Sequence, residues 1–258
     1  MNRSRGFCPK GASEYQDQLL DQMLETAAEG TVGVFDLDGC LFDTRTRQVA
    51  IVREFASRYD VFTLFDIHEE HFVDWSISRT LSLLGLDEGR VAELEKPLYK
   101  FWAPRFFDGS YARFDAVMPG SATFVRACAK RGMNIVYLTG RHHEMREGTI
   151  SALKAYGFPY GEPDAILITK PDQFMKDTPY KKQALEQIKS MGEPVLFVDN
   201  EPSNVNAFDL AYPNAKTVFI ETDHSPRPIS PRPHIPWLRS WYRLDWEGAE
   251  YELPQYTH

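Results

Sequence analysis

One short stretch, residues 31–44, constrains the fold of this chain more than any other part of it. It reads T-V-G-V-F-D-L-D-G-C-L-F-D-T. Its apolar run at 32–35 is short, β-branched and aromatic, which is typical of a buried strand. Asp36 and Asp38 follow that strand, where parallel sheets bind ligands, and Gly39 lets the chain turn away. Because like charges this close are costly unless they share a cation or a proton, the pattern predicts a metal site.

A regular alternation of strands and helices follows in the second half of the chain. Short apolar runs predict further strands, and single amphipathic helices separate them. This alternation predicts the α/β fold class, with a doubly wound, Rossmann-like parallel sheet. The predicted strands lie at residues 134–138, 165–168, 194–198 and 216–220.

Two segments do not fit this alternation. Residues 45–113 have apolar side chains at helical spacing, so we predict a small helical cap domain inserted into a core of residues 1–44 and 114–222. Residues 223–258 are rich in proline and tryptophan, which makes them too irregular for a helix and too apolar for a free tail. We predict a C-terminal arm that packs on the core or on a second subunit, which leaves a homodimer open.

Length, charge and cysteine content narrow the class of protein. A chain of 258 residues can bury one core and a smaller accessory domain. The net charge of −8 argues against nucleic acid and against an anionic membrane as partners. Cys8, Cys40 and Cys128 lie far apart, as is typical of free thiols in a reducing compartment. Since the sequence has no long apolar run and no hydrophobic signal core, we expect a cytoplasmic protein without a membrane span.

Polar side chains stand at the ends of three predicted strands. Chance could place one such group at a strand end, but three in this order are much harder to dismiss. The set consists of Asp36 and Asp38, then Thr139, and then Asp199 with Asn200.

These residues carry a resemblance to a known family. D-L-D-G at 36–39, with L-F-D-T after it, resembles the first motif of the haloacid dehalogenase-like (HAD) superfamily of Mg²⁺-dependent phosphatases. The resemblance extends over the predicted core, and the predicted cap lies where that family inserts a domain over its active site. It implies hydrolysis of a phosphate monoester through an aspartyl-phosphate, with Mg²⁺ as the cofactor. The residues match this requirement, because a carboxylate that attacks a doubly negative phosphate needs a cation to suppress the repulsion, and Mg²⁺ is commonly held by carboxylate oxygens.

The resemblance also implies a role for each acid. Asp36 would be the nucleophile, while Asp38 would protonate the leaving oxygen and then activate water. Asp36, Asp38 through its backbone carbonyl, and Asp199 would hold Mg²⁺. Asn200 stands beside them where many relatives have a second acid, so we predict weaker Mg²⁺ binding.

Further residues are candidates for holding the substrate phosphate. Thr139 resembles the second motif of the family, whose hydroxyl binds a phosphate oxygen, and Gly140 follows it. Arg47 and Arg141 have spacings similar to those of polynucleotide kinase-phosphatases, and an arginine fork can clamp a phosphate at two points. A salt bridge between core and cap is an equally good interpretation of the two arginines.

The third motif of the family requires a lysine that counters the phosphate charge. D-T-P-Y-K-K at 177–182 resembles the corresponding segment of polynucleotide kinase-phosphatases, which favours Lys181 as the catalytic lysine. Lys176 is the second choice and a substrate-binding candidate. The full set of candidates is Lys170, Lys176, Lys181 and Lys182.

We therefore predict an Mg²⁺-dependent phosphatase that acts on a small phosphorylated substrate. A large cap disfavours bulky polymers because it has to close over the whole ligand. Arg47, Arg141 and Lys181 leave a nucleotide or nucleic-acid end phosphatase as an alternative. A non-catalytic binding module on the same fold is a second alternative, and the presence of Asp38 disfavours dehalogenase chemistry.

Overall fold

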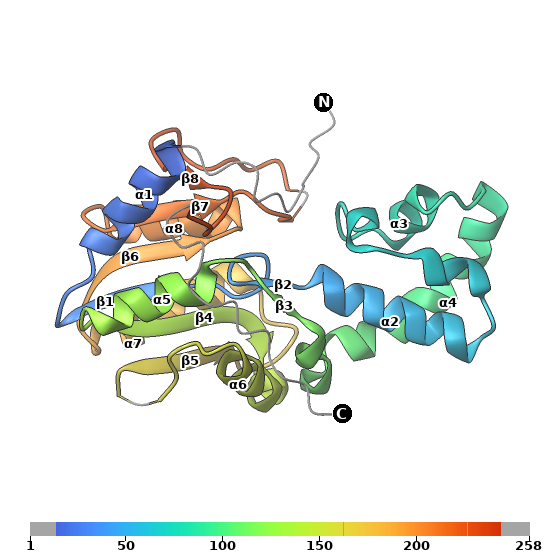
Figure 1. The fold of residues 1–258 in the computed structure, drawn as a ribbon, viewed down its shortest axis with the longest axis horizontal. Coiled ribbons are helices and arrows are strands. Elements are labelled where there is room, and N and C mark those ends of the chain that lie inside the picture. Colours follow the sequence, from blue (N-terminus) through green and yellow to red (C-terminus); the bar gives the residue numbers. More distant parts are fainter. Residues whose placement is uncertain (1–13, 162, 226, 244–258) are drawn as a thin grey trace.

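The computed structural model describes residues 14–161, 163–225 and 227–243, and the core within them is built on one parallel sheet. Its six strands lie in the order β5-β4-β1-β6-β7-β8, and each neighbouring pair is parallel (Figure 1). This confirms the predicted fold class. The strands are β1 (Thr31–Phe35), β4 (Asn134–His142), β5 (Ala165–Lys170), β6 (Glu193–Asp199), β7 (Lys216–Ile220) and β8 (Trp237–Leu238).

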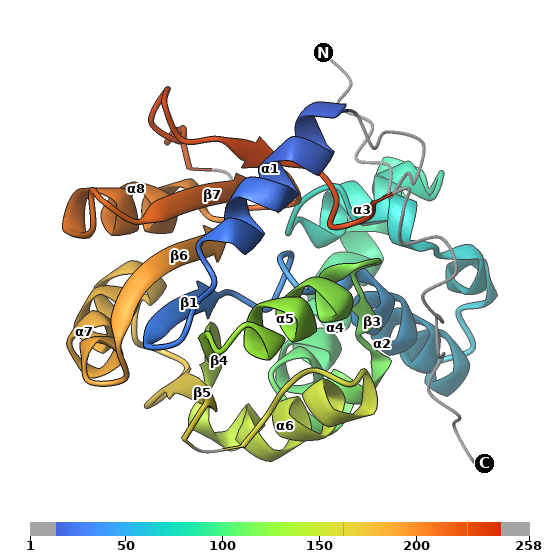
Figure 2. The same cartoon turned by 60° about the vertical axis from the view of Figure 1, so that its left-hand side comes forward.

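Helices cover both faces of the sheet, as alternating strands and helices require. One face packs against α1, α5 and α6, and the other against α7 and α8 (Figure 2). No helix in the described ranges is both long and apolar enough to cross a membrane. The helices are α1 (Glu14–Glu25), α5 (Ser121–Lys130), α6 (Arg146–Ala155), α7 (Asp177–Lys189) and α8 (Pro202–Ala211), with a short 3-10 helix η4 (His143–Met145) before α6.

The inserted segment forms a helical unit beside the sheet (Figure 1). Its apolar side chains, from Val49 to Phe101, pack into a cluster of their own, separate from the clusters that cover the sheet. The longest helix continues through Pro97 and Pro104. The elements are α2 (Arg45–Arg58), η1 (Phe62–Asp66), η2 (Glu69–His71), α3 (Ile77–Leu83), α4 (Glu88–Phe106) and η3 (Gly109–Phe114).

A two-stranded antiparallel pair joins this cap to the core. It consists of β2 (Phe42–Asp43) and β3 (Ala116–Val117), with Phe42 opposite Val117. The chain therefore leaves and re-enters the core at one place. Strands of two residues carry no periodic signal, so the sequence did not predict this pair.

The described part of the arm packs on the core of its own chain. β8 extends the sheet beside β7, and the buried Trp241 donates a hydrogen bond from its indole to the carbonyl of Cys40 at 2.8 Å. The sequence predicted packing here but no strand, because several prolines directly precede the two residues that pair. Residues 226 and 244–258 of the predicted arm lie outside the described residues.

Candidate active site

Three core elements bring a lysine and two acids together at the carboxyl edge of the sheet. Asp36 follows β1, Asp199 ends the neighbouring β6, and Lys181 lies in α7. The ammonium nitrogen of Lys181 donates to Asp36 Oδ1 at 2.6 Å and to Asp199 Oδ2 at 2.7 Å. All three side chains are buried. We call these three residues the lysine cluster.

Burial determines the protonation of the lysine cluster. It raises the pKa of Asp36 to about 8, although Lys181 opposes the shift, and the charge of Asp199 adds to it. Burial also raises the pKa of Asp199, although the positive charge of Lys181 lowers it. Burial would lower the pKa of Lys181, but the two acids raise it. One ammonium group thus faces two carboxyl groups, and a proton or a metal cation has to balance the remaining negative charge.

The residues after β6 hold the carboxylate of Asp199 in place. The backbone nitrogen of Glu201 donates to its Oδ1 at 2.8 Å, and the amide of Asn204 donates to both oxygens at 3.2 and 3.1 Å. Asn204 in turn accepts a hydrogen bond from the hydroxyl of Thr178 at 2.8 Å. The start of α8, near this carboxylate, adds the positive end of a helix dipole. Asp199 is therefore held in a single orientation by groups on two helices.

Two buried arginines form a second network on the cap side. Arg47, at the start of α2, donates to both oxygens of Asp115 at 2.7 and 2.5 Å. Arg141, near the end of β4, donates to Asp115 at 2.6 Å and to Asp38 at 2.9 Å. We call Arg47, Arg141, Asp115 and Asp38 the arginine network. Both arginines are thus engaged in salt bridges, one of which joins the cap helix to the core.

Asp38 differs from Asp36 in its exposure and its charge balance. Its side chain is 34% exposed. Burial opposes its ionisation, but Arg141 and then Arg47 bring the pKa of Asp38 below its ordinary value. In the free protein Asp38 is therefore ionised at neutral pH.

The other predicted residues of the second motif and the metal site lie nearby. Thr139 is buried in β4, its hydroxyl accepts a hydrogen bond from the backbone of Arg141 at 3.2 Å, and it does not border the cavity described below. Gly140 does border it, and a Cβ there would lie 2.9 Å from Asp177 Oδ2. Asn200 also borders the cavity and donates from its side-chain amide to the carbonyl of Asp223 at 2.5 Å.

The four candidate lysines occupy different places. Lys181 lies between the acids as described, whereas Lys170 donates to Asp177 at 2.7 Å and borders the cavity. Lys176 and Lys182 are exposed and do not border it. The structure therefore does not bring Lys176 to the other predicted site residues.

A cavity of about 290 Å³ opens over both networks, between core and cap. The lysine cluster, Asp38 and Arg141 border it on the core side, and Arg47 and Gln48 border it from the first turn of α2. Aromatic side chains border it on the cap side, and residues of the arm complete the wall. The cap contributes Trp75, Trp102, Phe106 and Phe107, and the arm contributes Asp223, His224, Ser225 and Arg227.

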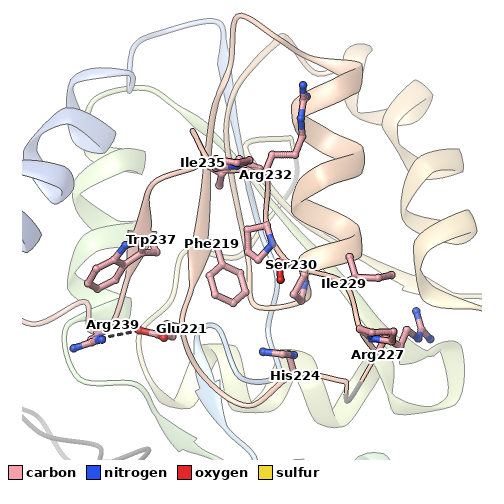
Figure 3. Close-up of a pocket in the computed structure, with 14 residues that line it drawn as sticks. Phe219, Glu221, His224, Arg227, Ile229, Ser230, Arg232, Ile235, Trp237 and Arg239 are labelled. Atoms are coloured by element: carbon pink, nitrogen blue, oxygen red, sulfur yellow. Dashed lines mark hydrogen bonds and ion pairs between the residues drawn. The ribbon is translucent and has the colours of Figure 1, made fainter. Parts of the chain in front are cut away.

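A second cavity, of about 560 Å³, lies under the arm beside β7 and the start of α8. Figure 3 shows Phe219 in its middle, between Trp237 on one side and Ser230 on the other. At its rim Arg239 donates to Glu221 at 2.8 Å. His224 and Arg227 border both cavities, so the arm is a shared wall.

The donor set at the first cavity consists of oxygen ligands. Asp36 and Asp199 reach a common point, since both lie within 2.7 Å of one lysine nitrogen. In the described part of the chain, no group of three or more His, Cys, Asp or Glu side chains converges as a metal site. Two carboxylates suffice for Mg²⁺, which is commonly held by one or two carboxylates together with water and substrate phosphate. The residues present therefore fit this metal.

Sequence reasoning missed several residues that border or build the site. Asp115 and Asn204 carry no motif, and their roles depend on partners far along the chain or on another helix. The cap aromatics were visible only as apolar positions of predicted helices. No signal in a single sequence separates an aromatic residue of a helix core from one that borders a cavity.

Comparison with known proteins indicates which protein family this chain is similar to. The model of the HAD superfamily, subfamily IIIB (acid phosphatase), matches residues 100–199, a segment that includes Thr139, Lys181 and Asp199. No curated protein matches the chain significantly.

Solved structures share the fold at low sequence identity. A predicted phosphoglycolate phosphatase from Haemophilus somnus 129PT is 15% identical with a TM-score of 0.53, covering 83% of this chain and 95% of that one. Protein tyrosine kinase A from Mycobacterium tuberculosis is 16% identical with a TM-score of 0.50, covering 84% and 95%. A chain of the Pnkp1/Rnl/Hen1 complex is 15% identical with a TM-score of 0.45, covering 77% of this chain and 48% of that one.

The fold and the family model that matches residues 100–199 indicate which class of protein this chain resembles. The first two structural neighbours share the α/β architecture, but one is named as a phosphatase and the other as a kinase. The fold by itself therefore does not determine the substrate. The family model adds the class of reaction. The match over residues 100–199 indicates a phosphoric monoester hydrolase similar to the acid phosphatases of the HAD superfamily.

Proposed function

We propose that this protein is an Mg²⁺-dependent phosphatase that hydrolyses a small phosphate monoester through an aspartyl-phosphate on Asp36. One observation carries the proposal: Lys181 contacts both Asp36 and Asp199 inside a cavity at the sheet edge. The arrangement gives a carboxylate nucleophile, a fixed positive charge for the phosphate and a second carboxylate for a metal. These are the groups that a doubly negative substrate requires.

The proposed metal ligands are the side chains of Asp36 and Asp199, the backbone carbonyl of Asp38, and Asn200. Bound there, Mg²⁺ would neutralise phosphate charge and so favour attack by a carboxylate. Asp199 is suited to this role because Glu201 and Asn204 already fix its orientation.

In the first proposed step, an oxygen of Asp36 attacks phosphorus, and the bond from phosphorus to the ester oxygen breaks. Asp38 gives its proton to the departing oxygen, so an alcohol leaves and an aspartyl-phosphate remains. In the second step, Asp38 takes a proton from water as the water oxygen attacks phosphorus. Inorganic phosphate leaves, and the carboxylate of Asp36 is restored.

Asp38 has to gain a proton before the first step, although Arg141 holds it ionised in the free protein. An incoming phosphate dianion places like charge beside Asp38 and competes for Arg141. Both effects raise the pKa of Asp38. We infer that binding of the substrate converts Asp38 into the acid that the leaving group requires.

The test is phosphate release from a panel of monoesters, measured with Mg²⁺ and after its removal by a chelator. We expect turnover that requires Mg²⁺ and is abolished in Asp36→Asn. Asp66→Asn, which changes an exposed acid of the cap, is the matched control and keeps full activity. Turnover that survives in Asp36→Asn would contradict the proposed nucleophile.

A nucleotide or nucleic-acid end phosphatase uses the same chemistry on a different leaving group. A scaffold without activity would be indicated if no monoester is hydrolysed and deletion of residues 224–258 abolishes binding of a partner. The matched family model favours the enzyme.

A further inference from the structure

The cavity between core and cap has two walls of different chemistry. The core wall is charged, with Asp36, Lys181 and Asp199 at its base. On the cap side, beyond the first turn of α2, all of the residues that border the cavity are aromatic: Trp75, Trp102, Phe106 and Phe107. A substrate with its phosphate at Asp36 therefore presents its other end to aromatic rings.

Three of these rings form one continuous surface. The rings of Trp102 and Phe106 stack with centroids 4.5 Å apart and an interplanar angle of 19°. Phe107 meets Phe106 edge-on, with centroids 5.3 Å apart at 90°. These contacts hold the three rings against one another, so the surface exists before a ligand binds.

Trp75 lies in the segment before α3 and is 67% exposed. A large apolar side chain left in water at the mouth of a cavity can bury its face only when something covers it. A ligand that covers this ring removes apolar surface from water, which favours binding.

The aromatic wall discriminates between kinds of leaving group. A part of the substrate rich in hydroxyl groups would lose water against these rings without gaining hydrogen bonds there, which is unfavourable. A planar aromatic ring would instead gain stacking contacts. The polar residues Gln173, His224 and Arg227 border other parts of the cavity and suit the segment that links phosphate and ring.

We propose that the substrate is a phosphate monoester whose leaving group carries a planar aromatic ring, of the kind a nucleobase provides, and that Trp75 and Trp102 bind this ring. The inference rests on the proposed phosphatase function of the same cavity and adds its substrate class.

The decisive experiment compares adenosine 5′-monophosphate with ribose 5-phosphate. Both esters release the same type of primary alcohol, so they differ in the base and hardly in the chemistry at phosphorus. We expect kcat/KM to be about tenfold higher for the nucleotide, since stacking on an aromatic side chain contributes this much or more. Equal values for the two esters would overturn the proposal.

Variants of the aromatic wall assign the preference to particular rings. Trp75→Ala removes an exposed side chain, so the fold tolerates it, and we expect kcat/KM to fall several-fold more for the nucleotide than for ribose 5-phosphate. Trp102→Phe keeps an aromatic face and most of the preference. Phe62→Ala, which removes another exposed aromatic residue of the cap that does not border the cavity, is the matched control. An equal loss for both esters in Trp75→Ala would contradict the role of Trp75.

A binding measurement separates failure of this inference from failure of the proposed function. In Asp36→Asn the nucleophile is absent, and calorimetric titration reports affinity without turnover. Tighter binding of the nucleotide than of ribose 5-phosphate, reduced when Trp75→Ala is added, supports the ring site even if no ester is hydrolysed by the native protein. Equal affinities overturn it, whereas hydrolysis of both esters at equal rates overturns the substrate class and leaves the phosphatase intact.

Discussion

The lysine cluster and the arginine network face the same cavity and balance their charges differently. In the lysine cluster, one buried ammonium group faces the two carboxyl groups of Asp36 and Asp199. In the arginine network, two guanidinium groups face the two carboxylates of Asp38 and Asp115. The first set has more carboxyl groups than cations, so a proton or a metal ion has to balance it, while the second is neutral within itself.

We propose that this difference gives the two sets different tasks. A site with excess negative charge attracts a divalent cation and gains stability from it. A self-neutral network gains little from a cation, and it ties the cap helix α2 to the core through Arg47 and Asp115. It also controls the ionisation of Asp38 through Arg141. The lysine cluster therefore suits metal binding and attack on phosphorus, and the arginine network suits positioning and proton transfer.

The largest effect is expected for Lys181→Met, which removes the cation of the lysine cluster. We expect kcat/KM to fall about a hundredfold to a thousandfold, as for the loss of other fixed groups that stabilise transition-state charge. The metal-free variant is also destabilised because two buried carboxyl groups lose their partner. Phosphate-release kinetics and thermal unfolding with and without Mg²⁺ measure both effects. Lys182→Met, at the exposed neighbouring position, is the matched control, and a similar loss in both variants would contradict the assignment.

Asp115→Asn breaks the arginine network without touching the lysine cluster. Because it leaves two buried arginines with one carboxylate, we expect a loss of about 3 kcal/mol in the free energy of unfolding. We expect Mg²⁺ affinity to stay unchanged, since Asp115 is not among the proposed ligands. Urea unfolding and calorimetric Mg²⁺ titration check the two statements, with Asp164→Asn as a control at an exposed acid. A large change in Mg²⁺ affinity would show that the two sets are not separate.

The affinity for Mg²⁺ is expected to depend on pH through the lysine cluster. Burial raises the pKa of Asp36 to about 8, so below that pH the metal has to displace a proton from the metal-free protein. The affinity should therefore increase as the pH rises and level off above the pKa of Asp36. Calorimetric titration in two buffers of different ionisation enthalpy would detect the released proton. An affinity that is constant across this range would contradict the raised pKa.

The smallest effect is expected for the contribution of Asp38 to the stability of the folded protein at acid pH. Its pKa lies below the ordinary value because of Arg141 and Arg47, which outweigh burial. Its ion pairs therefore stabilise the folded protein above the unfolded pKa of about 4, and this stability is lost as the pH falls through the lower folded pKa. In Asp38→Asn, denaturant unfolding should show a smaller decrease in stability between neutral and acid pH. An identical decrease in both proteins would contradict the shift.

The sequence predicted the sheet because strands and helices alternate with clear periods of apolar residues. It missed the pair of β2 and β3 and the edge strand β8, which are two residues long each. It also placed the end of the strand that carries Thr139 too early, because β4 continues through polar residues to His142. Elements that are short or polar take their structure from their neighbours, and a local pattern does not report those neighbours.

The candidate site was predicted in outline from strand ends. Asp36, Lys181 and Asp199 lie in one cluster, as their motif positions suggested, whereas Lys176 lies outside the cavity. Asp115 could not be predicted, because its importance comes from Arg47 and Arg141, which reach it from α2 and β4.

By itself, the sequence determined the order of the longer strands and the helices between them, the acids at the carboxyl ends of β1 and β6, and the class of chemistry that such acids suit. These follow from local rules, since the period of apolar residues selects the element and the end of a parallel strand selects the position of the ligand. The tertiary structure decided which charges pair, which lysine lies between the acids, and which aromatic side chains border the cavity. Such partners are set by packing between segments distant in sequence, where burial makes each charge depend on the others around it.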